Sequence, residues 1–218
     1  MSPTRVTNDG SYAGRSPVTG NSPPPAVGSV RDTTLRLMEA AADAFSDNGF
    51  HATTTRDIAA RAGLSPAGVY VHFASKEELL FALSERGHIA ARDGLVAAAR
   101  AAESPSAALA AIMATFSQWH AEDYRMGRIV QYEFGHLTPT HREVVLHLRK
   151  EIDAVVRTVL DAGVATGEFD VDDIHATTLA LMSMCVDVAR WYTPGIRRTP
   201  EQIGATNAAL ALRLVRAR

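Results

Sequence analysis

The sequence predicts an all-α protein made of a small N-terminal helix-turn-helix domain and a larger helical C-terminal domain. From about residue 33 onward, apolar residues recur at intervals of three and four. Gly, Pro and Ser mark the ends of these segments, and no segment between them alternates as a β-strand does. We place a disordered tail at residues 1–30, the N-terminal three-helix domain at 31–85 and the second helical domain at 86–218.

The composition is that of a globular protein. Of the 218 residues, 46% are hydrophobic, and no unbroken apolar run reaches the roughly 18 residues of a membrane span. The N-terminus has no apolar segment of the kind a secretory signal needs, so we expect a cytoplasmic protein with no membrane partner. Cys185 is the one cysteine, which excludes an internal disulfide and paired-cysteine metal or redox motifs.

Residues 1–30 are rich in Ser, Pro, Gly and Thr and contain almost nothing to bury. This composition predicts the disordered tail. Arg5 and Arg15 could alternatively form an arm that contacts DNA, although an inert tail is the simpler interpretation.

The first amphipathic helix is expected from Thr33 to Asn48. Its apolar side is formed by Leu35, Met38, Ala42 and Phe45. Gly49 should end it, because glycine readily adopts a positive φ.

Two short helices follow, joined by a tight turn. Thr54 or Thr55 can cap the first, and Gly63 ends it. Ser65 is a fresh N-cap with Pro66 at the first helical position, where a missing N–H costs nothing. Two short helices around such a turn indicate a helix-turn-helix.

The remainder of the chain is expected to be helical as well. Ser75 and Glu78 predict a capping box that opens a fourth helix, which would link the two domains. Further helices are expected at about 105–121, 124–134, 139–165, 172–191 and 200–216.

The segment from Thr55 to Leu80 resembles the DNA-binding region of the TetR family of transcriptional regulators. The matching motifs are Asp57-Ile58-Ala59, Ala62-Gly63-Leu64-Ser65, Tyr70, His72-Phe73 and Ser75-Lys76-Glu77-Glu78-Leu79-Leu80. They cover about a quarter of the chain. The resemblance implies a homodimer whose two recognition helices enter the major groove of a near-palindromic double-stranded DNA operator.

The resemblance assigns DNA contacts to individual positions. Expected phosphate contacts are Thr54, Thr55, Tyr70, His72 and Lys76, and candidates for facing base edges are Ser65, Ala67, Gly68 and Val71. For Tyr70 and His72, packing within the domain is the alternative. Because the base-facing set lacks the Arg, Asn and Gln that make bidentate base contacts, we expect modest direct readout supplemented by DNA shape. The net charge of -2 gives no general attraction to nucleic acid, so affinity must come from local placement.

The C-terminal part resembles the TetR regulators of fatty-acid and sterol catabolism, which respond to acyl-CoA thioesters. The similar segments are Met182-Ser183-Met184-Cys185, Arg190-Trp191-Tyr192-Thr193-Pro194-Gly195 and Thr199-Pro200-Glu201-Gln202-Ile203. The resemblance implies a small-molecule effector and places an acyl-CoA or another elongated apolar ligand ahead of a planar aromatic or cationic drug. Arg190, Arg197 and Arg198 could meet its phosphates, or could simply be solvated.

Isolated polar residues on otherwise apolar helices are the candidate ligand contacts, and ordinary core or surface positions are the alternative. They are Ser117, Trp119, His120, Tyr124, Tyr132, Glu133, His136, Met182, Cys185 and Arg190. In the family the last two helices form the dimer interface. Residues of suitable size are Ala205, Ala208, Ala209, Leu212 and Val215 with Leu181, Met184 and Val188, for which intramolecular core is the competing interpretation.

Two other functional classes fit the sequence less well. His136, His141 and His147 lie close in sequence, but no metal, nucleophile or phosphate-loop motif completes them, so neither an enzyme nor a cofactor is expected. The alternative is a helical small-molecule-binding or interaction module that does not bind DNA. In the favoured interpretation, a repressor is released by its ligand, and the helix from Ser75 carries the shift to the DNA-binding domain.

Overall fold

In the computed structural model, all regular structure between residues 27 and 216, the residues that the structure describes, is helical, and side chains are placed from residue 30. The elements are α1 (Val27–Ala52), α2 (Thr55–Arg61), α3 (Pro66–Tyr70), α4 (Lys76–Arg100), α5 (Pro105–Glu122), α6 (Tyr124–Tyr132), η1 (Phe134–His136), α7 (Pro139–Thr166), α8 (Ile174–Val186), α9 (Val188–Trp191) and α10 (Pro200–Leu214). No strand occurs over this range, which confirms the all-α prediction. Residues 1–26 of the expected tail, including Arg5 and Arg15, lie outside the described residues, and residues 27–30 belong to α1.

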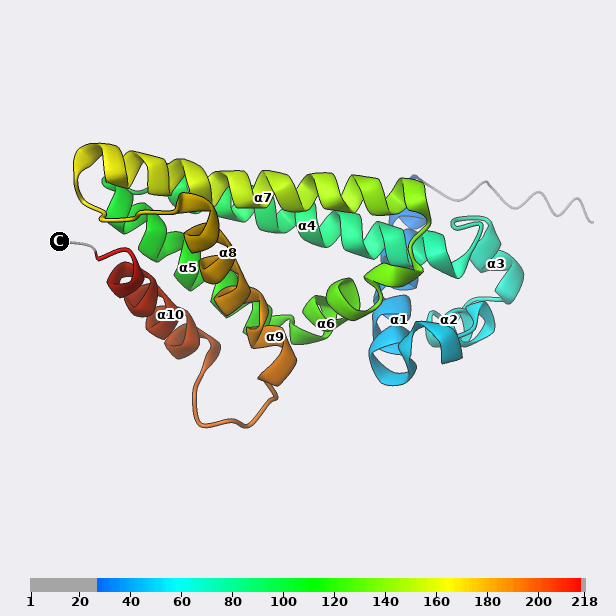
Figure 1. Ribbon diagram of the computed structural model, residues 1–218. Coiled ribbons are helices and arrows are strands. Elements are labelled where there is room, and N and C mark those ends of the chain that lie inside the picture. Colours follow the sequence, from blue (N-terminus) through cyan, green and yellow to red (C-terminus); the bar gives the residue numbers. More distant parts are fainter. Residues whose placement is uncertain (1–26, 217–218) are drawn as a thin grey trace, which may run out of the picture.

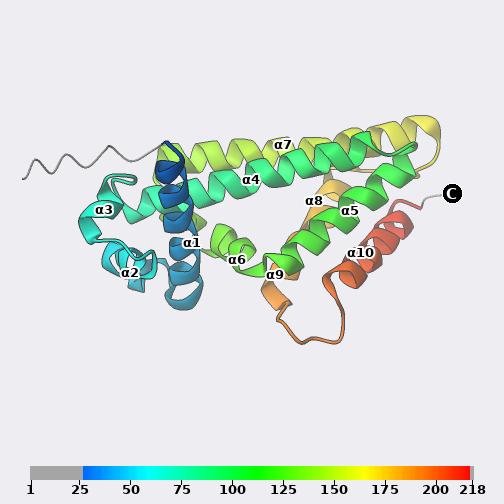
Figure 2. The same cartoon turned by 180° about the vertical axis from the view of Figure 1, so that it is seen from behind.

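The helices form a small unit at one end of the molecule and a larger bundle at the other (Figures 1 and 2). The helices α1, α2 and α3 gather around the beginning of α4. From there α4 continues alongside the long α7, while α5, α8 and α10 complete the far end. The short α6 lies between the two ends and contacts both α1 and α4.

Side-chain caps begin the helices where the sequence predicted them. The side chains of Thr54, Ser65 and Ser75 each accept a hydrogen bond from the backbone N–H three residues later. The capping box predicted at Ser75 is incomplete, because the Glu78 carboxylate accepts from the N–H of Ala74 (2.6 Å) instead of the N–H of Ser75. Helical structure continues to Ala52 after α1 kinks at a glycine with φ of 73°.

The segment predicted as one helix over 172–191 is two helices, α8 and α9. The break lies at Asp187, and side chains of α6 donate hydrogen bonds to the backbone carbonyls around it. Gln131 donates to the carbonyl of Val186 (3.1 Å), and Arg128 donates to the carbonyls of Ala189 (2.8 Å) and Tyr192 (2.8 Å). These contacts tie α6 to the turn between the two helices.

Two main hydrophobic clusters correspond to the two ends of the molecule. The first packs Phe45, Ile58, Val69 and Leu80 of the N-terminal helices together with Ile129 of α6. Because Ile129 is almost fully buried there, α6 is part of the core beneath the helix-turn-helix. In the described part of the chain, no helix is both long and apolar enough to cross a membrane.

Candidate DNA-contacting surface and effector cavity

The turn between α2 and α3 has the geometry that a helix-turn-helix needs. Gly63 has a φ of 66°, which a branched side chain would resist. Arg36 of α1 donates to the carbonyl of Ala62 just before this glycine and so fixes the end of α2. Ile58 and Val69, one from each helix, are completely buried between them and α1. The outer side of α3 is therefore left to solvent.

The candidates for facing base edges lie on this outer side. Ser65 and Ala67 are exposed at the start of α3, and Val71 is 80% exposed just after its end. Gly68 is half-buried, and its N–H donates to the Ser65 hydroxyl (3.1 Å) in the N-cap. Small side chains at these positions allow the backbone of α3 to approach a surface closely.

Four of the five expected phosphate contacts flank the same surface. The hydroxyls of Thr55 and Tyr70 are 3.2 Å apart and link the start of α2 to the end of α3. Thr54 caps α2 through Asp57 and is exposed. His72 is held through Nδ1 by the Thr34 hydroxyl (3.1 Å), so Nε2 is the ring nitrogen left for another partner.

Lys76, the fifth expected phosphate contact, is instead occupied inside the domain. Its ammonium donates to the carbonyls of Phe50 (2.6 Å), Thr53 (2.8 Å) and His51 (3.3 Å), and lies 4.4 Å from the centre of the Phe50 ring. An ammonium has three N–H donors, so these carbonyls use all of them. The geometry therefore corrects the sequence interpretation of Lys76: the side chain binds the end of α1.

Arg56 is a cation on this surface that sequence analysis missed. It is exposed in the first turn of α2, next to Thr55. A cation is unfavourable near a helix N-terminus, so its position is unexplained by helix stability alone. That signal was available in the sequence.

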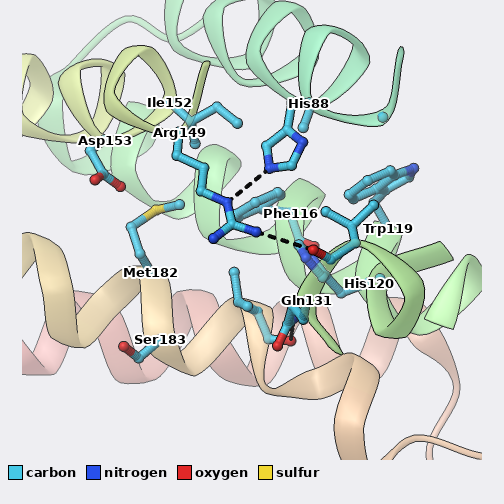
Figure 3. A pocket seen from close by; sticks show the side chains of 15 residues that line it. His88, Phe116, Trp119, His120, Gln131, Arg149, Ile152, Asp153, Met182 and Ser183 are labelled. Carbon is cyan, nitrogen blue, oxygen red and sulfur yellow. Dashed lines mark hydrogen bonds between the residues drawn. The ribbon is translucent and has the colours of Figure 1, made fainter. Parts of the chain in front are cut away.

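A cavity of about 380 Å³ lies in the larger bundle between α4, α5, α6, α7 and α8 (Figure 3). Aromatic and aliphatic side chains share its wall with several polar groups. The lining residues are Gly87, His88, Ala91, Phe116, Trp119, His120, Gly127, Val130, Gln131, Arg149, Ile152, Asp153, Met182, Ser183 and Val186. A largely apolar cavity with a few polar groups is typical of small-molecule binding.

Three of the predicted ligand contacts line this cavity, namely Trp119, His120 and Met182. Sequence analysis missed Arg149, His88 and Asp153, because α7 was recognised only by its apolar stripe and α4 only as a linker. Their charge or imidazole, placed on the bundle side of an amphipathic helix, would have been the available signal.

Ser117 and Cys185 lie in the core of the bundle and do not line the cavity. The Ser117 hydroxyl donates to Sγ of Cys185 (3.2 Å) and accepts from the amide of Asn207 (2.9 Å), all three being buried. Burial raises the pKa of the Cys185 thiol to about 12, so it stays protonated. These side chains tie α5, α8 and α10 together.

The other predicted ligand contacts also lie outside the cavity wall. Tyr124 packs against Tyr192, Tyr132 is 58% exposed, and Arg190 forms an ion pair with Asp187 (2.6 Å).

Glu133 and His136 belong instead to the junction with the N-terminal unit. The Glu133 carboxylate accepts from the N–H of Phe50 (3.3 Å) and lies 3.3 Å from His136, whose ring stacks on Phe50. The sequence had no signal for this junction, because the two segments are more than eighty residues apart.

His136, His141 and His147 do not converge. Each pairs with a different carboxylate: His136 with Glu133 (3.3 Å), His141 with Glu77 (2.9 Å) and His147 with Glu151 (3.3 Å). Over residues 30–216, no group of three His, Cys, Asp or Glu side chains could hold a metal ion.

Both histidines of the cavity are held in one tautomer and are neutral. Nδ1 of His88 donates to the carbonyl of Ser84 (2.7 Å), and Nδ1 of His120 donates to that of Phe116 (2.8 Å). Burial lowers the pKa of His88 and lowers that of His120 to about 4. Arg149 donates to Nε2 of His88 (3.2 Å). Burial also lowers the pKa of the Arg149 guanidinium.

Three of the eight residues predicted for a dimer interface are buried in the core of their own chain, as the competing interpretation expects. Leu181, Val188 and Val215 are completely buried, whereas Ala205 and Ala209 are exposed. The remaining three, Ala208, Leu212 and Met184, pack half-buried against the cluster that contains Leu181 and Val215. The exposed leucines on these helices are Leu179 (64%), Leu210 (42%) and Leu214 (50%).

Family models match both parts of the chain. The model for bacterial regulatory proteins of the tetR family matches residues 37–83, and the model for a tetracyclin repressor-like C-terminal domain matches residues 102–215.

Individual proteins match over most of their length. The chain is 31% identical over 191 residues to the transcriptional repressor KstR2 of Mycobacterium tuberculosis, covering 85% of this chain and 94% of that protein. A tetR-family regulatory protein from Rhodococcus RHA1 superimposes with a TM-score of 0.81 at 34% identity, over 85% of this chain and 98% of that one. The structure of M. tuberculosis KstR2, described as a ketosteroid transcriptional regulator, gives a TM-score of 0.71 at 29% identity, over 83% and 93% of the two chains.

Proposed function

The chain belongs to the TetR family of regulatory proteins, and we propose that it is a ligand-responsive repressor that binds a near-palindromic operator as a homodimer. The observation that carries this proposal is the outer side of α3, where Ser65, Ala67 and Val71 face solvent beside the linked hydroxyls of Thr55 and Tyr70. The similarity to a transcriptional repressor over 85% of this chain supports the same conclusion.

Some residues of this surface are suited to contact the phosphate backbone of DNA, and others to contact bases in the major groove. Thr54, Thr55, Tyr70 and His72 offer hydroxyls and an imidazole to phosphates, and Arg56 supplies the cation that Lys76 does not. Ala67 and Val71 can contact thymine methyl groups, and close approach at Gly68 brings the helix into the groove. Sequence preference then depends partly on DNA shape.

The homodimer is supported by an exposed apolar face on two helices. Leu179 of α8 and Leu210 and Leu214 of α10 are 42–64% exposed, and the small Ala205 and Ala209 lie on the same helix. Small and aliphatic residues allow two such helix pairs to pack closely in a four-helix interface. The dimer would present two copies of α3 to successive half-sites.

The cavity is the proposed effector site. At about 380 Å³ it has room for an acyl chain or another compact hydrophobic group, whereas a coenzyme A moiety would remain outside. The resemblance of the C-terminal segments to acyl-CoA-responsive regulators supports a thioester ligand.

Two helices connect this cavity to the DNA-contacting unit. In α4, Leu79 and Leu83 are in the N-terminal core, and Gly87 and His88 line the cavity one to two turns later. In α6, the buried Ile129 packs on the N-terminal core next to Val130, which lines the cavity. A ligand that binds better when α4 and α6 are displaced would lower operator affinity, by an ordinary coupling of about 1–3 kcal/mol.

Fluorescence anisotropy with DNA from the protein's own promoter region tests the proposal. We expect specific, salt-dependent binding by a dimer, with Val71→Ala altering the preferred base at one position in each half-site. A thermal-shift screen of acyl-CoAs and aromatic compounds then identifies ligands, which should release the operator. Ligand binding by a protein that shows no specific DNA binding would favour the alternative, a helical binding module.

The same proposal covers location and activity. A protein that acts on a chromosomal operator works in the cytoplasm. Because the matched relatives are transcriptional regulators, we propose that the chain has no catalytic activity of its own.

A further inference from the structure

The guanidinium of Arg149 lies in the middle of the cavity with part of its hydrogen-bonding capacity unused (Figure 3). Its Nε donates to His88 (3.2 Å), one Nη2 hydrogen goes to the carbonyl of Val130 (3.1 Å), and the Phe134 ring lies 4.4 Å from Cζ. A guanidinium has five N–H donors, so three remain available.

The positive charge of Arg149 has no ion-pair partner among the described residues, and the carboxylate of Asp153 acts on it only at longer range. Within residues 30–216 no carboxylate forms an ion pair with it. His88 is its nearest partner and is neutral, because Nδ1–H is used on the Ser84 carbonyl and Nε2 must accept. Asp153, the one carboxylate in the wall, lies one turn further along α7 and on the opposite side of the guanidinium from His88 in Figure 3. An unpaired cation in a partly desolvated site is costly until an anion arrives.

A second polar group of the cavity has a ring nitrogen that is free to accept a hydrogen bond. His120 is only 5% exposed, and its Nδ1 donates to the carbonyl of Phe116 (2.8 Å). Its Nε2 accepts no hydrogen bond from any residue that the structure describes, and the side chain lines the cavity near Arg149. This nitrogen is therefore free to accept a hydrogen bond from a donor group of the ligand.

We infer that the effector places a carboxylate inside the cavity, bound by Arg149, with its apolar part packed on Phe116, Ile152 and Met182. This inference rests on the proposed function, because it takes the cavity to be the effector site, and it narrows the ligand from an apolar compound to an amphipathic acid. The carboxylate can come from a free acid or from the far end of a dicarboxylic acyl thioester. A group that donates a hydrogen bond, such as a hydroxyl near the acid, would complete the match to His120.

Isothermal titration of the full-length protein without DNA tests this with acid and neutral partners of equal size. Octanoate is compared with octanamide, and adipoyl-CoA with hexanoyl-CoA, so the two pairs separate a free acid from a thioester acid. Since hydrogen bonds to charged groups are the strong ones, we expect the anion of one pair to bind about 10- to 100-fold tighter than its neutral partner.

Arg149→Met should abolish this preference while leaving the affinity for the neutral partner within about threefold. Arg142→Met is the matched control, because Arg142 lies on the same helix and also contacts the Phe134 ring, at 5.8 Å, but does not line the cavity. It should keep the preference. If Arg149→Met fails to fold, Arg149→Lys retains the charge without the planar fork and should show a reduced preference for the same anion.

The inference is overturned if neither anion outbinds its neutral partner in the unmodified protein, or if Arg149→Met keeps the preference. Operator binding is measured separately by anisotropy. A protein that prefers the acid but does not bind DNA would support this inference and contradict the proposed repressor function. A protein that binds its operator but shows no preference for the acid would contradict this inference and leave the repressor function standing.

Discussion

Lys76→Met tests whether the ammonium of Lys76 holds the end of α1 in place. The variant keeps the length and the packing of the side chain on Phe50, but removes donors at 2.6, 2.8 and 3.3 Å from three carbonyls. A hydrogen bond to a charged group contributes about 1.5–3 kcal/mol. The Lys76 side chain is half-buried, so water can replace part of each hydrogen bond, and the contributions of neighbouring bonds do not add. We therefore expect the free energy of unfolding to fall by about 2–3 kcal/mol in total.

Thermal unfolding followed by circular dichroism measures this loss. For a chain of this size, each kcal/mol lowers Tm by about 2–4 °C, so we expect Lys76→Met to lower Tm by about 4–12 °C. Lys150→Met, which changes an exposed lysine of α7, is the control and should alter stability by less than about 0.5 kcal/mol. The reasoning is refuted if Tm is unchanged while binding to all DNA sequences weakens and the salt slope falls by about 1, which is the behaviour of a phosphate contact.

Three further predictions concern the turn, the far bundle and the cavity. Gly63→Val should destabilise the protein by about 1–3 kcal/mol in urea titrations, because φ is 66° there; an unchanged midpoint would contradict this. Gly204→Ala places a Cβ 2.6 Å from the Ala114 carbonyl oxygen and should cost about 1–3 kcal/mol, whereas Gly135→Ala, with no atom within 4 Å of its added Cβ, should cost little; equal losses would show that α5 and α10 can separate freely. Burial lowers the pKa of His120 from 6.5 to about 4, so the unfolded chain binds the extra proton between these values. The contribution of His120 to the free energy of unfolding should therefore be fully present above about pH 6.5 and fall by about 3 kcal/mol as the pH approaches 4. The variant His120→Gln should lose this part of the pH dependence. An identical profile in the variant would assign the titration to another group.

The fold was largely predictable because its signals are local. Ser65 followed by Pro66 marks a helix start within four residues, and Gly63 marks a positive φ. The break at Asp187 was missed because it depends on Gln131 and Arg128, which donate to carbonyls across the bundle. A helix end set by a distant side chain leaves no mark on the sequence around it.

The site was predicted less well than the fold, since it depends on which residues meet in space. The exposed face of α3 followed from the motif, but Lys76 looked like a free cation because its three carbonyl partners lie more than twenty residues earlier. The cavity draws Arg149 and His88 from helices whose apolar periodicity concealed their polar positions. Which side chains line a cavity inside a bundle depends on how each helix is rotated about its own axis. The apolar periodicity of the sequence predicts this rotation only approximately.

The position of α6 explains how a cavity with one polar cluster could control a surface at the other end of the molecule. A Cβ added at Gly127 would lie 2.7 Å from Cβ of Ala189, so α6 already packs against α9 as closely as a glycine permits. Arg149 holds the carbonyl of Val130 on the same helix, and Ile129 is buried under α1. A ligand anion bound by the free N–H groups of Arg149 pulls on the guanidinium and, through its hydrogen bond to the carbonyl of Val130, on α6, while the close contact at Gly127 limits the movement of α6 toward α9. The remaining freedom of α6 is relative to α1 and α4, and displacement there changes the orientation of α3, on which operator binding depends.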